Sequence, residues 1–419
     1  MKRPPSALIS QGRLTQRLDA LARYGATPAG GVNRQALSPE DIAAQRQMIR
    51  WGLELGLEPS RDPAGNLFLR LPGSRPEAPA VLSGSHLDTQ PTGGRYDGVY
   101  GVAAALEAVQ AIVESGARPT RPIDIVAWMN EEGSRFAPGM AGSAAFAGAR
   151  SLEEIRSVSD AEGVTVAQAL DDAARAMPDI PLRPLGGHPA AYVEAHIEQG
   201  PVLERENKSV GVVTGIQGKR TFRVTITGEA AHAGTSTRAE RKDALLAATR
   251  SIQALTAQIH DEQDIVKFTI GRLTVAPNAP SVVPQQVVYS IDLRHPDSGV
   301  LIALGDLIAP LCRTHCPPCS VDVEELSRAL SLEFDPAVRD SIRRAASRLG
   351  IAHRDIASAA GHDARYLNDI CPSGMIFVPC HLGITHNEAE SARPEDLADG
   401  TRVLADVLME LAGGGSGAG

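Results

Sequence analysis

The sequence has few cysteines, no long apolar run and no basic stretch, and each absence excludes a class of protein. Five cysteines in 419 residues cannot form the dense framework of a disulfide-stabilised protein, which favours a reducing compartment. No segment approaches the roughly 18 consecutive apolar residues of a membrane-spanning helix. The basic start of the chain is not followed by the apolar run of a secretory signal peptide. We therefore expect a cytoplasmic protein that does not enter a membrane.

The charge balance disfavours nucleic acid as a partner. The chain has 41 Lys and Arg against 50 Asp and Glu, a formal net charge of −9, and no basic run exceeds a pair such as Arg343 and Arg344. Neutralising phosphates requires a basic stripe, and an acidic surface gains nothing at an anionic membrane. With 43% hydrophobic and 22% charged residues, the composition is typical of a folded globular protein. Domains average about 150 residues, so the length favours two to three of them.

Most of the chain alternates helices with short apolar strands. Ser38 and Pro39 are the expected cap and first residue of an early helix, and residues 98–114 carry apolar side chains at helical spacing. Four short apolar runs predict strands, at residues 78–83, 123–128, 191–195 and 374–378. This alternation predicts an α/β domain with a mostly parallel central sheet.

The middle of the chain has a different pattern. Strands and helices are predicted in the order βαββαβ, at residues 221–227, 241–260, 265–275, 285–294, 296–314 and 321–323. That order is typical of a ferredoxin-like α+β domain. We therefore predict a larger domain made of residues 1–213 and 326–412, interrupted by an inserted domain at 214–325. The Gly-rich residues 413–419 are expected to form a flexible tail.

Histidines and acids gather after the predicted strands. They are His86, Asp97, Glu131, Glu132, His196 and His386. Ligand sites in open α/β sheets lie outside the carboxyl ends of the strands, so we expect these side chains to meet at one edge. Three imidazoles with carboxylates suit zinc or a similar divalent ion. Asp97 can bridge two ions about 3.5 to 4 Å apart. Of two adjacent glutamates, one can bind metal while the other faces the reacting water.

Each of these residues alone has a simpler explanation. A single histidine more often satisfies a polar core or lies on the surface, and an acid pair such as Glu131 and Glu132 is usually a solvated turn. Only their joint position after apolar strands favours a metal site.

A second group of residues superficially suggests a zinc knuckle. Cys312, Cys316 and Cys319 surround His315. We reject this interpretation because the run crosses a predicted helix end and two prolines, and no second Cys or His pair lies nearby in the sequence.

At the predicted metal cluster the sequence resembles the amidase branch of the dinuclear-zinc aminopeptidase and acylase superfamily. That branch contains N-carbamoyl-L-amino-acid hydrolases, β-ureidopropionases and allantoate amidohydrolases. The matching motifs cover nearly the whole chain, at residues 84–89, 96–98, 130–136, 196–201, 228–234, 277–278 and 361–364. The resemblance implies a zinc-aminopeptidase-like catalytic domain and an inserted domain that closes as a lid and forms a homodimer.

The resemblance also implies a role for each member of the cluster. One ion would be held by His86, Asp97 and His196, and the other by Asp97, Glu132 and His386. Glu131 would be the general base, and Asp88 would orient the imidazole of His86. Two zinc ions are expected, although manganese, cobalt or nickel suit the same ligands.

Further residues are implied to bind the substrate. His232 and Asn278 of the inserted domain would reach the partner subunit's site, where His232 would stabilise the developing oxyanion. Arg294 would pair with the substrate's α-carboxylate, and Gln199, Asn278 and the backbone at Gly361 would complete the pocket. Without the resemblance, Arg294 is more simply a surface charge and Asn278 a turn residue.

The predicted function is metal-dependent hydrolysis of the ureido group of an N-carbamoyl-L-amino acid, which gives the amino acid, ammonia and carbon dioxide. Allantoate and β-ureidopropionate stay open as substrates, because each also presents a carboxylate and a ureido carbon. A catalytically silent homologue that binds metal or an amino acid is the alternative from a different class.

Overall fold

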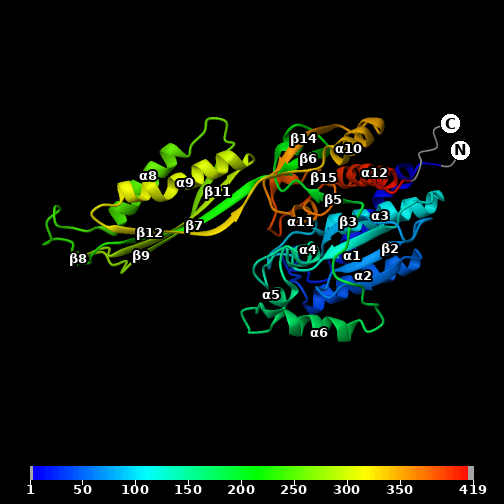
Figure 1. Cartoon of the computed structure of the whole chain (residues 1–419), viewed down its shortest axis with the longest axis horizontal. Helices are drawn as coiled ribbons and strands as arrows, with labels where there is room; N and C mark the ends of the chain where they lie inside the picture. The colour runs from blue at the N-terminus through cyan, green and yellow to red at the C-terminus, as the bar shows by residue number, and fades with distance from the viewer. Residues whose placement is uncertain (1–2, 414–419) are drawn as a thin grey trace. The chain divides into compact units, whose positions relative to one another are not determined.

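The structure, a computed structural model, describes residues 3–413 and divides them into two units (Figure 1). The main unit runs to Thr214 and resumes at Phe334, and the inserted unit spans Gly215–Glu333. The predicted end of the insertion at 325 falls inside a strand, Ser320–Ala329, because this strand has ten residues where the sequence predicted three. Residues 414–419 of the predicted tail lie outside the described residues.

The main unit is built on a central sheet whose inner strands are parallel. Its strands are β1 (Glu58–Arg61), β2 (Leu67–Leu71), β3 (Val81–His86), β4 (Ile123–Trp128), β5 (Ala191–Ile197), β6 (Val210–Ile216), β14 (His353–Ser358) and β15 (Ser373–Val378). The order is β1-β2-β4-β3-β5-β15-β6, and β14 pairs with β6. The neighbours β4, β3, β5 and β15 are parallel, and β2 and β6 flank them antiparallel. The predicted α/β architecture is confirmed.

Full burial explains why apolar residues predominate in the inner strands, although Asp124 of β4 and Glu194 of β5 are buried there as well. Every residue of β3, β4, β5 and β15 is buried, as expected when helices cover both faces of a parallel sheet. The helices of the main unit are η1 (Pro5–Leu8), α1 (Gln11–Leu21), α2 (Pro39–Glu54), α3 (Val99–Ser115), α4 (Ala141–Phe146), α5 (Leu152–Ser157), α6 (Val166–Ala176), α7 (Val202–Arg205), α10 (Pro336–Arg348), α11 (Ala364–Leu367), η2 (His381–Gly383) and α12 (Pro394–Leu411). Within residues 3–413, no helix combines the length and the apolarity that crossing a bilayer requires.

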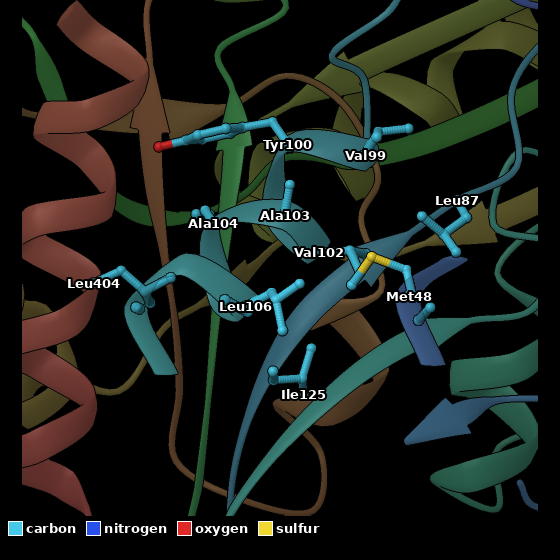
Figure 2. Packing of buried hydrophobic residues seen from close by; sticks show 14 of the residues in the cluster. Met48, Leu87, Val99, Tyr100, Val102, Ala103, Ala104, Leu106, Ile125 and Leu404 are labelled. Carbon is cyan, nitrogen blue, oxygen red and sulfur yellow. The ribbon is translucent and has the colours of Figure 1, made fainter. Parts of the chain in front are cut away.

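Helix α3 is buried along most of its length and begins beside the predicted site. Figure 2 shows Leu106 of α3 in the same apolar cluster as Ile125 of β4 and Leu404 of α12. At Gly101, an added Cβ would lie 2.3 Å from the carbonyl oxygen of Ala195. Glycine therefore allows the first turn of α3 to approach the backbone of β5 closely.

The inserted unit has the predicted βαββαβ order. Its elements are β7 (Gly218–Thr227), β8 (Ala231–His232), α8 (Ala244–Gln258), β9 (Lys267–Ala276), β10 (Val282–Val283), β11 (Gln286–His295), α9 (Ser298–His315), β12 (Ser320–Ala329) and β13 (Leu332–Glu333). Four strands form an antiparallel sheet in the order β12-β7-β11-β9, and α8 and α9 pack against it. The short strands β8 and β10 pair with each other, and β13 pairs with the end of β6. The ferredoxin-like fold is thus confirmed.

The close approach at Gly101 can be tested by adding a single methyl group. We expect Gly101→Ala to lower the free energy of unfolding by about 1 to 3 kcal/mol, because the methyl group would overpack the contact with β5. Gly12 of α1 has no atom within 4 Å of an added Cβ, so Gly12→Ala should be neutral or stabilise by up to about 1 kcal/mol. Urea unfolding of both variants measures this difference, and equal effects would contradict the packing argument.

Candidate metal centre

The ends of parallel strands bring the predicted residues together. His86 is the last residue of β3 and lies opposite Trp128, the last residue of β4, so Glu131 and Glu132 follow at the same edge. His196 is next to last in β5. The edge predicted from the sequence is therefore the place where these side chains meet.

The carboxylate of Asp97 lies between two groups of side chains. Its Oδ1 atom is 3.2 Å from Nε2 of His196 and 3.8 Å from Nε2 of His86. Its Oδ2 atom is 3.2 Å from Nε2 of His386, which is 3.4 Å from Oε2 of Glu132. In each group, His86 with Asp97 and His196, or Asp97 with Glu132 and His386, the candidate ligand atoms lie within 4.8 Å of one another. The carboxylate of Asp97 therefore belongs to both sets.

Burial and mutual charge set the protonation of this cluster. Although burial opposes it, hydrogen bonds from His196 and His386 lower the pKa of Asp97 well below its usual range. Burial and then the charge of Asp97 raise the pKa of Glu132 to about 8. Against the effect of burial, the hydrogen bond to Asp97 raises the pKa of His196 to about 9.

Glu131 stands apart from both ligand sets. Its Oε2 atom is 3.6 Å from Nε2 of His86. Burial first, and then the charges of Asp363 and Glu132, raise the pKa of Glu131 well above its usual range. A buried carboxylate beside a cation site, and not consumed as a ligand, can hold and release a proton.

The residues present fit a divalent ion. Nitrogen and carboxylate oxygen donors converge here, which is the donor set that zinc and similar ions prefer. The set of His86, Asp97 and His196 is buried, whereas the other set opens to the surface at the exposed His386. The buried oxygen atoms Oε1 of Gln199 and Oδ2 of Asp363 have no hydrogen-bond partner. Buried polar atoms of this kind normally find one, so the site is built to receive further atoms.

Backbone carbonyls orient the two buried imidazoles. Nδ1 of His86 donates to the carbonyl oxygen of Asp88 at 2.9 Å, and Nδ1 of His196 donates to that of Ile197 at 2.9 Å. Each ring thereby turns Nε2 toward Asp97, the arrangement in which outer contacts fix a metal-binding tautomer. Asp88 thus contacts His86 as predicted, with the backbone making the hydrogen bond, since its Oδ1 is 3.7 Å from Nδ1.

The carboxylate of Asp88 has a different set of contacts. Oδ1 accepts the backbone N–H of Glu131 at 3.2 Å, and Oδ2 accepts that of Glu132 at 3.1 Å. Asp88 therefore holds the turn that presents the two glutamates. This contact was missed because the sequence alone does not show which loop faces a given side chain.

Other residues that contact the candidate ligands were also not predicted from the sequence. Nε2 of Gln90 donates to Oε2 of Glu132 at 2.8 Å. The hydroxyl of Thr385 lies 2.8 Å from Oδ2 of Asp97 and 3.0 Å from Oε2 of Glu390. The only signal in the sequence is their position beside predicted ligands, which by itself does not distinguish them from other loop residues.

A third cluster lies behind His196. Ligand atoms of Glu194, His196 and His362 also fall within 4.8 Å of one another. Both carboxylate oxygens of Glu194 already accept hydrogen bonds, from Ser85 at 2.7 Å and from the backbone of Ala364 at 3.1 Å. Glu194 thus connects β5 with β3 and with the start of α11.

The predicted pocket residues of the main unit differ in their contacts. Nε2 of Gln199 donates to Oδ2 of Asp97 at 2.9 Å, so Gln199 reaches the metal cluster itself. Gly361 lies at the surface before α11, where an added Cβ would be 3.3 Å from the methyl group of Met140.

The three predicted residues of the inserted unit lie at two ends of its sheet. Arg294 pairs with Lys219 near the start of β7, and its Nε donates to Asp292 at 2.8 Å. His232 lies five residues beyond Thr227, the last residue of β7, and pairs with Val282. Asn278 follows β9 at the same end as His232. His232 and Asn278 are exposed, and Arg294 is half-buried.

The cysteine run belongs to the core of the inserted unit. Cys312, Cys316 and Cys319 are buried among its apolar residues as free thiols. Among the described residues, they take part in none of the candidate metal groups.

Comparison with known proteins places this centre in a family. Residues 82–410 match the family described as peptidase family M20/M25/M40. The chain belongs to this family. Over 409 residues it is 38% identical to an N-carbamoyl-L-amino-acid amidohydrolase of Rhizobium meliloti, which covers 96% of this chain and 97% of that protein. It is 34% identical to an allantoate amidohydrolase of Escherichia coli K12, covering 95% and 97%.

Solved structures of the M20/M25/M40 family agree with the fold. A hydantoinase/carbamoylase family amidase from Burkholderia multivorans superposes with a TM-score of 0.89 at 42% identity, covering 96% of this chain and 98% of that one. The predicted resemblance to the amidase branch is confirmed.

Proposed function

We propose that the protein is a metal-dependent amidohydrolase that removes the carbamoyl group of N-carbamoyl-L-amino acids. The observation that carries this proposal is the division of labour around Asp97, whose two oxygens serve two ligand sets while Glu131 stays outside both. A two-metal hydrolytic site requires this combination of a shared carboxylate and a free base. The similarity to amidohydrolases over nearly the full chain supports the substrate class.

The metal ions and the compartment are part of the same proposal. His86, Asp97 and His196 would hold one ion, and Asp97, Glu132 and His386 the other, with zinc first and manganese, cobalt or nickel as substitutes. Bound there, two such ions would polarise the ureido carbonyl and make a water molecule acidic. We propose the cytoplasm as the compartment, since all five cysteines are buried free thiols, which a reducing environment preserves.

The chain's own groups would move the protons. Glu131 would accept a proton from the attacking water and return it to the leaving nitrogen, because it lies beside the ligands and its surroundings raise its pKa well above the usual range. Asp88 would keep Glu131 in place through the backbone. Gln199 and the backbone at Gly361 would contact the substrate.

Allantoate is the second candidate substrate, favoured by the similarity to the enzyme of Escherichia coli. β-Ureidopropionate stays open as well, because it presents the same carboxylate and ureido carbon. A silent binding homologue, the alternative from another class, is disfavoured because Glu131 and both ligand sets are intact.

A substrate panel with a Glu131 variant tests the proposed activity. We expect zinc-loaded protein to hydrolyse N-carbamoyl-methionine faster than allantoate or N-carbamoyl-β-alanine, and a chelator to abolish turnover. Glu131→Gln should lower kcat by at least about 100-fold with unchanged metal content, because the amide cannot accept the proton. Ammonia release and metal analysis measure both quantities.

The exposed Glu153 of α5 provides the matched control, and Glu153→Gln should leave kcat unchanged. Substantial turnover by Glu131→Gln would contradict the proposed role of Glu131 as the general base. A lack of activity of the metal-loaded native protein on all three substrates would favour the silent homologue.

We also propose that the active site is completed by a second copy of the chain. Arg294 pairs with Lys219, and His232 lies beyond Thr227 at the other end of β7. Eight residues of strand span about 26 Å, which no carbamoyl amino acid can bridge. If both side chains contact one substrate, they must come from different subunits.

The local geometry of His232 suits a donor to an oxyanion. Its Nδ1 atom accepts the backbone N–H groups of Gly234 at 3.0 Å and Thr235 at 3.2 Å. A neutral imidazole that accepts at Nδ1 carries its proton on Nε2. His232, with Asn278 beside it, would thus offer a hydrogen-bond donor to the partner's substrate, while Arg294 would bind the carboxylate.

Mixed dimers of two inactive variants test this arrangement. We expect Glu131→Gln and His232→Ala each to be inactive alone, and their equimolar co-expression to restore about a quarter of native activity. Half of the dimers would be mixed, and each of these would retain one intact site. If His232 served its own subunit, co-expression would restore nothing, and sedimentation as a monomer would also contradict the proposal.

A further inference from the structure

A buried glutamate outside both ligand sets connects the two loops that carry Asp97 and His386. Glu390 is 4% exposed. Its Oε1 atom accepts the backbone N–H of Tyr96 at 2.8 Å and that of Asp97 at 3.2 Å. Glu390 therefore fixes the backbone of the residue that both proposed ions would share.

The second oxygen of Glu390 reaches the side chain of Asp97 through a hydroxyl group. Oγ1 of Thr385 lies 3.0 Å from Oε2 of Glu390 and 2.8 Å from Oδ2 of Asp97. A hydroxyl has one proton, so Thr385 bridges the two carboxylates with a shared donor. Because His386 follows Thr385 directly, the same contact sets the position of that imidazole.

The space for this carboxylate is built into the sequence. At Gly94 an added Cβ would lie 2.0 Å from Cδ of Glu390, so any larger residue at position 94 would displace the carboxylate. The loop of Glu390 also has an independent anchor, since Glu388 accepts the hydroxyl of Thr27. The loop is therefore anchored without Glu390. The contacts of Glu390 with residues 96, 97 and 385 indicate a different role for its carboxylate.

We propose that Glu390, acting through Thr385, is a positioning residue that holds Asp97 and His386 at the separation a shared pair of divalent ions requires. This inference rests on the proposed metal-dependent function. Removing the carboxylate would leave two backbone N–H groups with a poorer acceptor and would release the hydroxyl of Thr385, so that Gln199 would be the remaining tethered donor to Asp97. Such losses around a metal ligand typically lower metal affinity by about 10- to 100-fold. A purely structural contact would lower stability without changing the metal's surroundings.

The test uses the full-length chain, stripped of metal and titrated with zinc against a chelating indicator, then with cobalt to record its visible spectrum. We expect Glu390→Gln and Thr385→Val each to weaken zinc binding by about 10- to 100-fold and to change the cobalt spectrum. Thr385→Ser keeps the hydroxyl and should restore both readouts.

Two buried residues outside the site serve as matched controls. Glu107 accepts hydrogen bonds from Arg13 and Arg17, and Thr401 donates to a helix carbonyl. Glu107→Gln and Thr401→Val should lower Tm and leave the zinc affinity and cobalt spectrum native.

The possible outcomes separate this inference from the function on which it rests. Native zinc affinity and a native cobalt spectrum in Thr385→Val and Glu390→Gln would overturn the positioning role and leave the proposed function standing. Failure of Thr385→Ser to restore the readouts would also overturn it. Absence of zinc binding by the native chain would overturn the proposed function itself, and this inference with it.

Discussion

The carboxylate of Asp97 is the constraint on which the rest of the site depends. One oxygen faces His86 and His196, and the other faces His386. Glu131 and Glu132 bring further negative charge into the same buried space. An unpaired charge in such surroundings is strongly unfavourable. The arrangement is therefore best understood as the protein half of a cation site.

The fold supplies that constraint through its parallel strands. Because β3, β4 and β5 end at one edge, loops far apart in the sequence deliver their polar residues to one place. Gly101 lets α3 approach β5 closely, which fixes the start of the helix just after Asp97. Asp88 and Glu390 then hold the backbones of the loops that carry the reactive side chains. Contacts with the main chain of these loops thus help to set the positions of the reactive side chains.

Most of the candidate ligands could be singled out in the sequence because they follow an apolar run, and Asp97 because it precedes a predicted helix. The ferredoxin-like insertion could be predicted because its six elements have clear periodicities. Apart from Asp88, which the family resemblance implied, the residues that contact and position the candidate ligands could not be predicted. Glu390 and Thr385 are polar residues in a loop without periodicity, and their partners lie almost 300 positions away in the chain. The length of β12 was also underestimated, because beyond residue 323 the strand is largely exposed and has no apolar alternation. Contacts between distant loops are decided by packing, which a sequence pattern does not encode.

The separation of Arg294 from His232 in the inserted unit is the basis for our proposal that the site also requires another copy of the chain. The whole proposal, including the role of the second copy, assumes that Asp97 is shared by two ions. The most direct measurement is the number of zinc ions bound per chain at equilibrium, by the native protein and by Asp97→Ala. We expect two ions for the native chain and loss of both tight sites in the variant. A native chain that binds one ion, or a variant that loses only one of two, would contradict the shared carboxylate.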